Sequence, residues 1–499
     1  MNNPHNLDQP AEWAGIWWLP ESPDEKVPGV LHYDAKGGLI LSLIGGFEER
    51  VITREPSVDG TQIKWFGEES RVWNAIHGVS EYQKITLLGC YPSLTKRSKP
   101  YFAKPDSPGK QNIAASIALN GIHLNDENSP AFSSTEVSFE DLGVWAAISG
   151  IERGFGFSDD EELNGSGSIR ITPCNKQSVI VEEKEICLVS GNTLPYIDHQ
   201  KGKTIAKISE SVIVQIKSKT PLSLTDTLEE MVTIQNLISL AMHRAVGTIW
   251  VQLEIDGTES RLPDGRELPR RRAQMLYKPP ALGVADAQAV ETHRTLFTCD
   301  TIPFSEIVPR WYEVHSRLRT AINMIMSLRY TPTQYIESNL LTSVGAVEVI
   351  HRCLGIGNKP FSVGEFKAMR SAMLEQVPEK HRDKFKSAIR NDQTLRERLY
   401  DLVNYLDPAV ISKLMPDVKK WAKFTVKARN NLAHEGRTGH SDEELITIVD
   451  IATIVVIFIV LQELGVSVEQ QLNIFDENPQ IRGIARRAHK IIVAPAKES

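Results

Sequence analysis

Near its C-terminal end the chain carries the six-residue stretch Arg-Asn-Asn-Leu-Ala-His, from Arg429 to His434. Arginine keeps its positive charge at physiological pH, whereas histidine gains and loses a proton near neutrality. This pair suits cleavage of RNA without a metal, because histidine can move the proton of a 2′-hydroxyl or of the leaving oxygen. Arginine can hold the phosphate while its negative charge grows. The stretch therefore predicts a ribonuclease site formed by Arg429, Asn430 and His434.

The spacing of this motif raises a geometric problem. Residues five apart on a continuous α-helix point about 140° away from each other, so Arg429 and His434 would not share a face. Either the helix tightens or ends near Asn431, or a second copy of the chain completes the site across a two-fold axis. The second alternative predicts an obligate homodimer.

Basic residues close to the motif are candidate RNA contacts. Lys420, Lys423 and Lys427 precede it at helical spacing and form one basic stripe, and Arg437 follows it. On the residues alone, a capped helix end with a solvated lysine face explains the stretch as well as an active site does. The same spacing recurs from Arg310 to His315, where we predict a helix surface with a partly buried tryptophan after the arginine.

A second basic cluster, Arg270, Arg271 and Arg272, is a further candidate for RNA contact, although solvated loop charge explains it equally well. The net charge of −7 means that any nucleic-acid contact must come from such local patches. The five cysteines form no CxxC pair, and the histidines lack metal-ligand spacing, so we expect reduced thiols, no metal site and no cofactor.

The helices that must position the motif can be predicted from their end signals. Pro416 suits the first turn of a helix with Trp421 and Ala428 on its buried side, and Gly436 suits its end. The segment 441–444 reads as a capping box that opens an apolar helix running to residue 465. The apolar run 451–461 is too short to span a bilayer and predicts a buried helix. The N-terminus lacks a signal-peptide pattern, which favours a cytoplasmic location.

A chain of 499 residues predicts about three domains. Residues 1–164 hold short strand-like runs, with Gly37-Gly38 as a hairpin signal, and predict a β-rich barrel or sandwich. Residues 165–304 predict an α+β region, with a helix from Leu224 to Gly247 and a strand from Thr248 to Ile255. Residues 305–499 predict an all-α helical bundle. The fold class is thus α+β multidomain, β-rich in front and all-α behind.

The stretch 429–434 within an all-helical domain resembles the R-x4-6-H signature of HEPN-superfamily ribonucleases, in which a polar residue follows the arginine. The segment 335–352 resembles the early helix of that domain in ApeA-type abortive-infection proteins. The segments 29–33, 37–46 and 119–145 resemble the β-rich domain that precedes HEPN in the same family.

This resemblance implies a bacterial antiphage protein whose HEPN dimer cleaves RNA without metal and leaves a cyclic phosphate. Arg429 would neutralise the phosphate, His434 would be the acid/base and Asn430 would orient the substrate or the motif. Glu348 would face Arg429, or would form a surface salt bridge. The β-rich region would act as sensor or brake, with a phage-derived protein as the trigger. The alternatives are a non-catalytic HEPN-like module that binds a nucleotide or a protein, and a scaffold with no nucleic-acid role.

Overall fold

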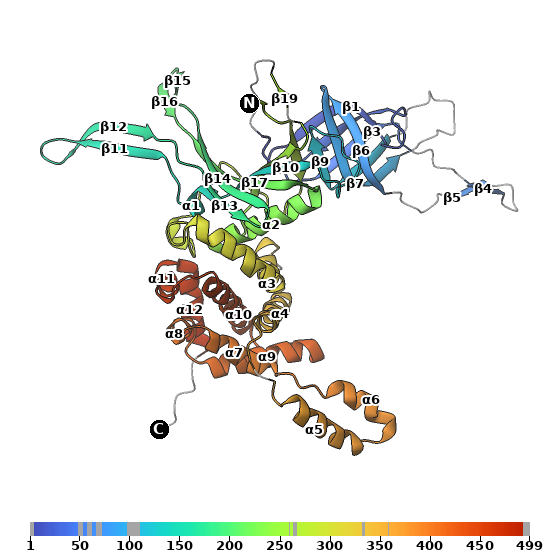
Figure 1. The fold of residues 1–499 in the computed structure, drawn as a ribbon, viewed down its shortest axis with the longest axis vertical. Coiled ribbons are helices and arrows are strands. Elements are labelled where there is room, and N and C mark those ends of the chain that lie inside the picture. Colours follow the sequence, from blue (N-terminus) through green and yellow to red (C-terminus); the bar gives the residue numbers. More distant parts are fainter. Residues whose placement is uncertain are drawn as a thin grey trace. The chain divides into compact units, whose positions relative to one another are not determined.

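The β-rich part of the chain is built on one large antiparallel sheet (Figure 1). The structure, a computed structural model, describes residues 4–47, 53–56, 62–65, 72–96, 110–258, 260–262, 267–331, 335–357 and 359–492. Within these residues 13 strands follow the order β13-β14-β17-β10-β18-β21-β9-β7-β6-β1-β2-β3-β8. Their bounds are β1 Ala11–Trp18, β2 Val27–Tyr33, β3 Leu39–Ile44, β6 Trp73–Ser80, β7 Gln83–Lys96, β8 Lys110–Ala115, β9 Ile117–Asn120, β10 Phe132–Phe139, β13 Gln177–Val181, β14 Lys184–Asn192, β17 Glu210–Leu222, β18 Thr248–Ile255 and β21 Arg272–Tyr277.

One end of this sheet closes into a six-stranded barrel, β7-β6-β1-β2-β3-β8, because β7 also pairs with β8. The first part of β7 pairs with β9 through residues 85–88, and its last part pairs with β8 through residues 91–96. Gly89 lies between the two parts with a φ of +60°, a conformation that glycine adopts without strain. Alternate side chains such as Trp17, Leu31 and Leu41 are buried inside the barrel. The β-rich N-terminal region expected from the sequence is therefore confirmed, as a barrel.

The predicted hairpin at Gly37-Gly38 is confirmed and joins β2 to β3. Asp34 Oδ1 accepts hydrogen bonds from the backbone N–H groups of Lys36, at 2.7 Å, and Gly38, at 2.9 Å. These bonds hold the turn and lower the pKa of the Asp34 carboxyl. Gly37 supplies the positive φ, +83°, that the turn needs.

The rest of the sheet joins the first two predicted regions. The expected boundary at residue 164 falls inside β12 (Leu163–Ile171), and β10 lies between β17 and β18. Residues before and after that boundary therefore share one sheet and one compact unit, Met1–Ser239, Val246–Val290 and Thr298–Pro309.

Strand β18 has the predicted bounds, whereas helix α2 (Leu224–Ala241) ends before the predicted Gly247. Short two-stranded hairpins and the short helix α1 complete the described part of the unit. Their bounds are β4 Thr53–Pro56, β5 Gln62–Trp65, α1 Leu142–Ala146, β11 Ile151–Phe157, β15 Tyr196–Gln200, β16 Lys203–Lys207, β19 Ser260–Arg261 and β20 Glu267–Leu268.

The second unit, Leu240–Ala245, Glu291–Phe297 and Arg310–Ser499, is helical, as predicted for the C-terminal region. Its elements are η1 Thr292–Arg294, α3 Phe304–Tyr330 (whose first turns belong to the first unit), α4 Ile336–Leu354, α5 Val363–Glu375, α6 Glu379–Ala388, α7 Leu395–Tyr405, α8 Pro408–Leu414, α9 Val418–Glu435, α10 Asp442–Glu463, α11 Val468–Glu477 and α12 Pro479–Ile491. Helix α10 packs against α4, α7, α9, α11 and α12 and is the centre of the bundle.

Helix α10 begins with the capping box predicted from the sequence. Ser441 Oγ accepts from the backbone N–H of Glu444, and the Glu444 carboxylate accepts from that of Ser441. Leu340 of α4, Ala428 of α9 and Ile448 of α10 are buried in one cluster. Helix α10 is long and apolar enough to cross a membrane, but 78% of its most apolar window is buried within the structure. The expectation of a buried helix is confirmed.

Candidate active site

Helix α9 carries the motif and is continuous from Val418 to Glu435. Asp417 caps its N-terminus, with Oδ1 accepting from the backbone N–H of Lys420 at 2.9 Å. Pro416 therefore precedes the cap, and its predicted place in the first turn is wrong. Gly436 ends the helix as predicted, with a φ of +70° and its N–H bonded to Leu432 O.

The continuity of α9 decides between the two explanations of the spacing. The helix neither tightens nor ends near Asn431, so that explanation is wrong. Arg429 and His434 lie on different faces of a regular helix, about 140° apart. Completion of the site by a second copy of the chain stays a prediction.

Arg429 faces the bundle, where it meets an acidic residue of α4. Its guanidinium lies 3.5 Å from Glu348 Oε1 in an ion pair, and its Nη1 donates a hydrogen bond to Asn430 Oδ1 at 3.3 Å. The Arg429 side chain keeps 37% of its surface exposed, whereas Glu348 keeps 19%. Arg429 is thus held by two acceptors while part of its guanidinium is open to solvent.

Glu348 is shared by three arginines. Besides Arg429, the Nη atoms of Arg352 and Arg398 lie 3.6 and 3.7 Å from its Oε2. The inward orientation that the sequence allowed for Glu348 is therefore the observed one. Arg398, of α7, was missed by the sequence analysis, because only the packing of α7 against α4 and α9 brings it here. One carboxylate thus gathers three guanidiniums at one place, and their combined positive charge suits an anion.

His434 is exposed near the end of α9 and, within the described part of the chain, forms no hydrogen bond or ion pair. Asn430 and Arg437 are exposed as well. The imidazole is therefore available to solvent, to a substrate or to a second protein surface. Neither nitrogen is committed to a structural role.

The predicted lysine stripe is only partly free. Lys423 and Lys427 are exposed, whereas Lys420 is partly buried, with its Nζ 5.4 Å from the centre of the Phe424 ring. The Phe424 ring also lies 5.0 Å from His440, whose side chain is 5% exposed and whose Nδ1 is 3.3 Å from Glu444 Oε2. His440, to which no local sequence pattern points, thus links the loop after α9 to the start of α10.

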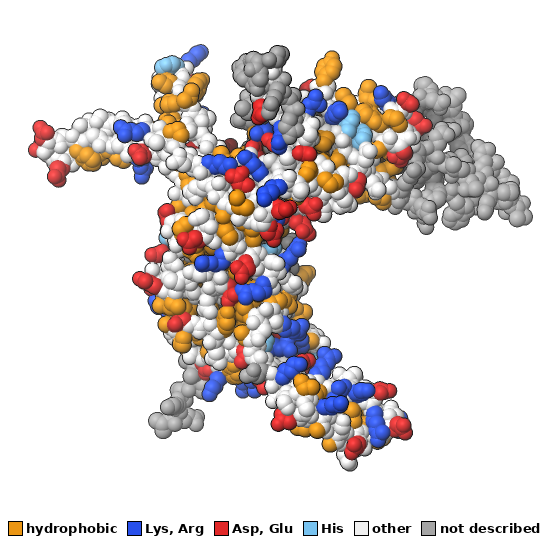
Figure 2. All heavy atoms as spheres, viewed as in Figure 1, with side chains coloured by type: hydrophobic (Ala, Val, Ile, Leu, Met, Phe, Trp, Pro, Cys, Tyr) orange, Lys and Arg blue, Asp and Glu red, His pale blue; other side chains and the backbone are white. Residues whose placement is uncertain are grey.

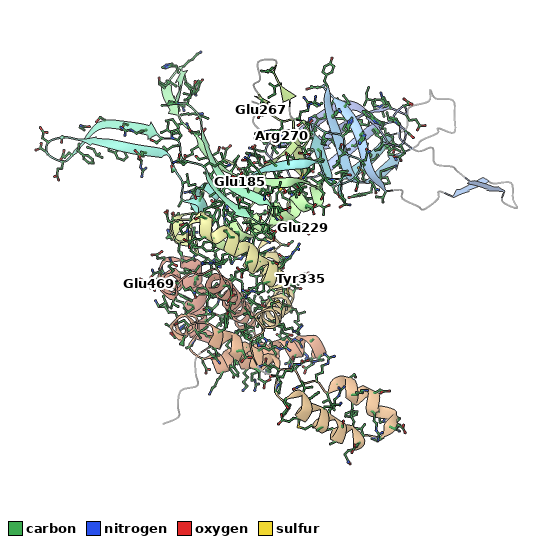
Figure 3. All side chains as sticks on the ribbon, viewed as in Figure 1. Glu185, Glu229, Glu267, Arg270, Tyr335 and Glu469 are labelled. Atoms are coloured by element: carbon green, nitrogen blue, oxygen red, sulfur yellow. The ribbon has the colours of Figure 1, made fainter. Side chains whose placement is uncertain are left out.

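The second basic cluster lies in the β-rich unit, where two of its members are paired with carboxylates. Arg270, labelled in Figure 3, has its Nη1 3.0 Å from Glu254 Oε1. Arg272 bonds to both carboxylate oxygens of Glu136, at 3.0 and 3.1 Å. Arg271 is exposed. The ion pairs of Arg270 and Arg272 lie within the first unit, whereas the motif belongs to the second.

The tryptophan and the histidine of the second R-x4-H copy lie in the helical core, whereas its Arg310 is partly buried and its Glu313 is exposed. Trp311 of α3 is fully buried and His315 is 7% exposed, so the expectation of a partly buried tryptophan on a surface is wrong. Arg310 donates to Leu464 O at 2.7 Å. Burial, with a smaller contribution from Arg319, lowers the pKa of His315 to about 4. This copy is structural.

A cleft of about 640 Å³ opens beside Arg429 and Asn430. Its wall also includes Glu348 and residues from the loop before α7 and the first turns of that helix. Its size falls in the usual range of ligand-binding pockets, about 300–1,000 Å³. The arginine and asparagine of the motif therefore line a hollow large enough for a nucleotide, whereas His434 is not among the lining residues.

Models of known protein families match residues in both units. Residues 12–311 match the model of ApeA N-terminal domain 1, and residues 341–470 match the model of the Apea-like HEPN domain. The first match alone covers more than half of the chain. No curated protein and no solved structure shows significant similarity to the chain.

Proposed function

Because the chain belongs to the ApeA family of HEPN-containing antiphage proteins, we propose that it is a metal-independent endoribonuclease of abortive infection. One observation carries the proposal. Arg429 and Asn430 line a cleft while His434, five residues on in the same helix, has both ring nitrogens uncommitted within the described residues. Groups of both kinds that the proposed reaction needs are thus open to solvent.

The proposed reaction is attack of a 2′-hydroxyl on the neighbouring phosphorus. A bond forms between O2′ and phosphorus, the bond from phosphorus to O5′ breaks, and the products end in a 2′,3′-cyclic phosphate and a 5′-hydroxyl. His434 transfers the protons, taking one from the 2′-hydroxyl or returning one to O5′. Arg429 stabilises the charge on the non-bridging oxygens, and Asn430 holds the Arg429 guanidinium or the substrate.

We propose that the active form is a homodimer through the HEPN-like domain, with Arg429 and His434 acting from opposite chains. The regular helix supports this, since the two side chains diverge on it. A mixture of Arg429→Ala and His434→Ala chains tests the idea. Heterodimers keep one arginine and one histidine on different chains, so the mixture should regain activity that each variant lacks. A mixture that is as inactive as each variant alone contradicts the composite site. A chain that cleaves RNA and sediments as a monomer contradicts it as well.

The β-rich unit is proposed to restrain the nuclease in the cytoplasm until a phage-derived protein binds. A toxic nuclease needs such a brake, and a domain that holds two half-sites apart could supply it. Total RNA should stay intact in uninfected cells that express the chain and become fragmented after infection. Equal fragmentation before infection contradicts the need for a trigger.

The main test compares the wild type with Arg429→Ala and His434→Ala, and uses His489→Ala, an exposed histidine of α12, as the matched control. RNA fragmentation that persists in EDTA, survives in the control and disappears in both motif variants is expected. RNA left intact by the wild type during infection would favour the second candidate, a non-catalytic module that binds a nucleotide or a protein. The arginine-lined cleft is the observation that favours that candidate.

A further inference from the structure

The cleft beside Arg429 is strongly basic. Five arginines line it, against the two carboxylates of Glu348 and Asp392; they are Arg352, Arg390, Arg396, Arg398 and Arg429. A planar guanidinium matches two oxygens of one phosphate group. The excess of guanidinium groups therefore suits a ligand with more than one negative charge.

The five arginines fall into two groups. Arg352, Arg398 and Arg429 lie 3.5 to 3.7 Å from Glu348. Arg390 and Arg396 are exposed, and among the described residues neither forms a hydrogen bond or an ion pair. Glu348 thus accounts for the first group only. The guanidiniums of the second group are open to solvent and can contact a ligand in the cleft.

The backbone that carries this second group is held in place. Asn391, next to Arg390, accepts from Phe361 N at 3.1 Å and donates to Phe361 O at 2.8 Å. Arg396 lies in the first turn of α7, which Thr394 caps at 3.3 Å. Two guanidiniums on fixed backbone lose less freedom on binding than the same groups on a loose loop would.

Positive charge continues from the cleft along the helical arm formed by α5 and α6. Helix α6 carries Lys380, Arg382, Lys384 and Lys386, all exposed, and ends two residues before Arg390. Figure 2 shows Lys and Arg side chains in blue over this arm, with fewer acidic ones between them. Neither α5 nor α6 has a buried residue, so the arm contributes surface and not core.

We propose that Arg390 and Arg396 bind the phosphodiesters of single-stranded RNA next to the one held by Arg429. The strand then runs from the motif past the start of α7 to the base of the arm. This inference rests on the proposed function, since it assigns the path of its substrate. Arg390 and Arg396 are binding residues in this arrangement, so they set affinity and not the rate of the chemical step.

The experiment separates binding from cleavage. Binding of a fluorescently labelled single-stranded RNA is measured by anisotropy on full-length His434→Ala chains, with and without Arg390→Gln and Arg396→Gln. We expect at least about tenfold weaker binding in the double variant. The slope of log affinity against log salt should also fall by about 1.4, the value for two lost single-strand phosphate contacts. Cleavage by chains with His434 intact should show a raised KM and a nearly unchanged kcat.

The matched control is Arg153→Gln with Arg486→Gln, two exposed arginines outside the cleft that change the net charge equally. Unchanged binding in the cleft variant, or an equal loss in the control, overturns the inference. The inference also fails if Arg390→Gln and Arg396→Gln weaken the binding of a mononucleotide but not the binding of RNA. If the wild type never cleaves RNA but its RNA affinity depends on this pair, the proposed nuclease fails and the binding site stands.

Discussion

The two R-x4-H copies of this chain have the same spacing, but the tryptophan and histidine of one are buried and the asparagine and histidine of the other are exposed. In α3 the residue after the arginine is Trp311, which is fully buried, and His315 is buried beside it with ring centres 5.2 Å apart. In α9 the corresponding residue is Asn430, which is exposed and lines a cleft, and His434 is exposed as well. The comparison shows that access to solvent, and not the spacing of arginine and histidine, separates a candidate site from a core.

The reason lies in the other residues of each helix. Trp311 and His315 are four residues apart, so they share the buried face of α3. The His315 Nε2 has no hydrogen-bond partner there among the described residues. The two asparagines of α9 carry no comparable apolar surface. A motif that needs a charged and a titrating group can function only where both reach water or substrate.

The largest effect expected from this comparison concerns the two histidines. His434→Ala should lower RNA cleavage by about 10² to 10⁴-fold, the usual contribution of a general acid or base, and leave thermal unfolding unchanged. His315→Ala should lower the unfolding temperature without a comparable loss of the cleavage rate measured below that temperature. Cleavage assays and thermal melts of both variants test this. The reverse pattern would move the active site to α3.

The second-largest expected effect is a difference in stability when the residues that follow the two arginines are replaced by alanine. Trp311→Ala should destabilise the fold by about 3–5 kcal/mol, because it leaves a large cavity in a packed core. Asn430→Ala should change the free energy of unfolding by less than about 0.5 kcal/mol, as expected for an exposed side chain. Urea denaturation of both variants measures the difference. Similar losses in the two would show that Asn430 is structural.

A smaller loss of stability is expected when Glu348, which forms ion pairs with three arginines of the cleft, is replaced. Glu348→Gln removes the negative charge but keeps the shape, and should destabilise the fold by about 1–2 kcal/mol, less than a fully buried pair. Glu337→Gln, an exposed residue of the same helix, is the matched control and should change little. Urea denaturation at low and high salt measures both. A stabilised Glu348→Gln chain would mean that desolvation of Glu348 outweighs its ion pairs.

The last prediction concerns a pH dependence of stability at His315. Its pKa is lowered to about 4 in the folded chain from an ordinary value near 6.5, so the unfolded chain binds more protons between these values. The stability that neutral His315 contributes is complete above about pH 6.5 and is lost as the pH falls towards 4. His315→Gln should therefore lose less stability than the wild type between pH 7 and pH 4.5. Equal losses would show that His315 is not the group that titrates.

Local signals in the sequence predicted local structure well. The turn at Gly37, the strand Thr248–Ile255, the capping box at Ser441 and the end of α9 at Gly436 were all found from neighbouring residues. Each depends on the conformational preference of one or two residues, so no distant contact is needed. The predicted boundary at residue 164 depended on a change of pattern along the chain, which cannot show that strands on both sides pair in one sheet.

The sequence alone determined the chemistry available to this protein: an arginine, an amide and a histidine at the end of one helix, in a β-rich and then all-α chain. Side-chain type and helical spacing are local properties, and they already implied that Arg429 and His434 diverge. Only the tertiary structure decided which R-x4-H copy is accessible, that Glu348 meets three arginines, and that Arg390 and Arg396 share a cleft with Arg429. These facts depend on packing between segments distant in the chain, and no pattern within one segment specifies them.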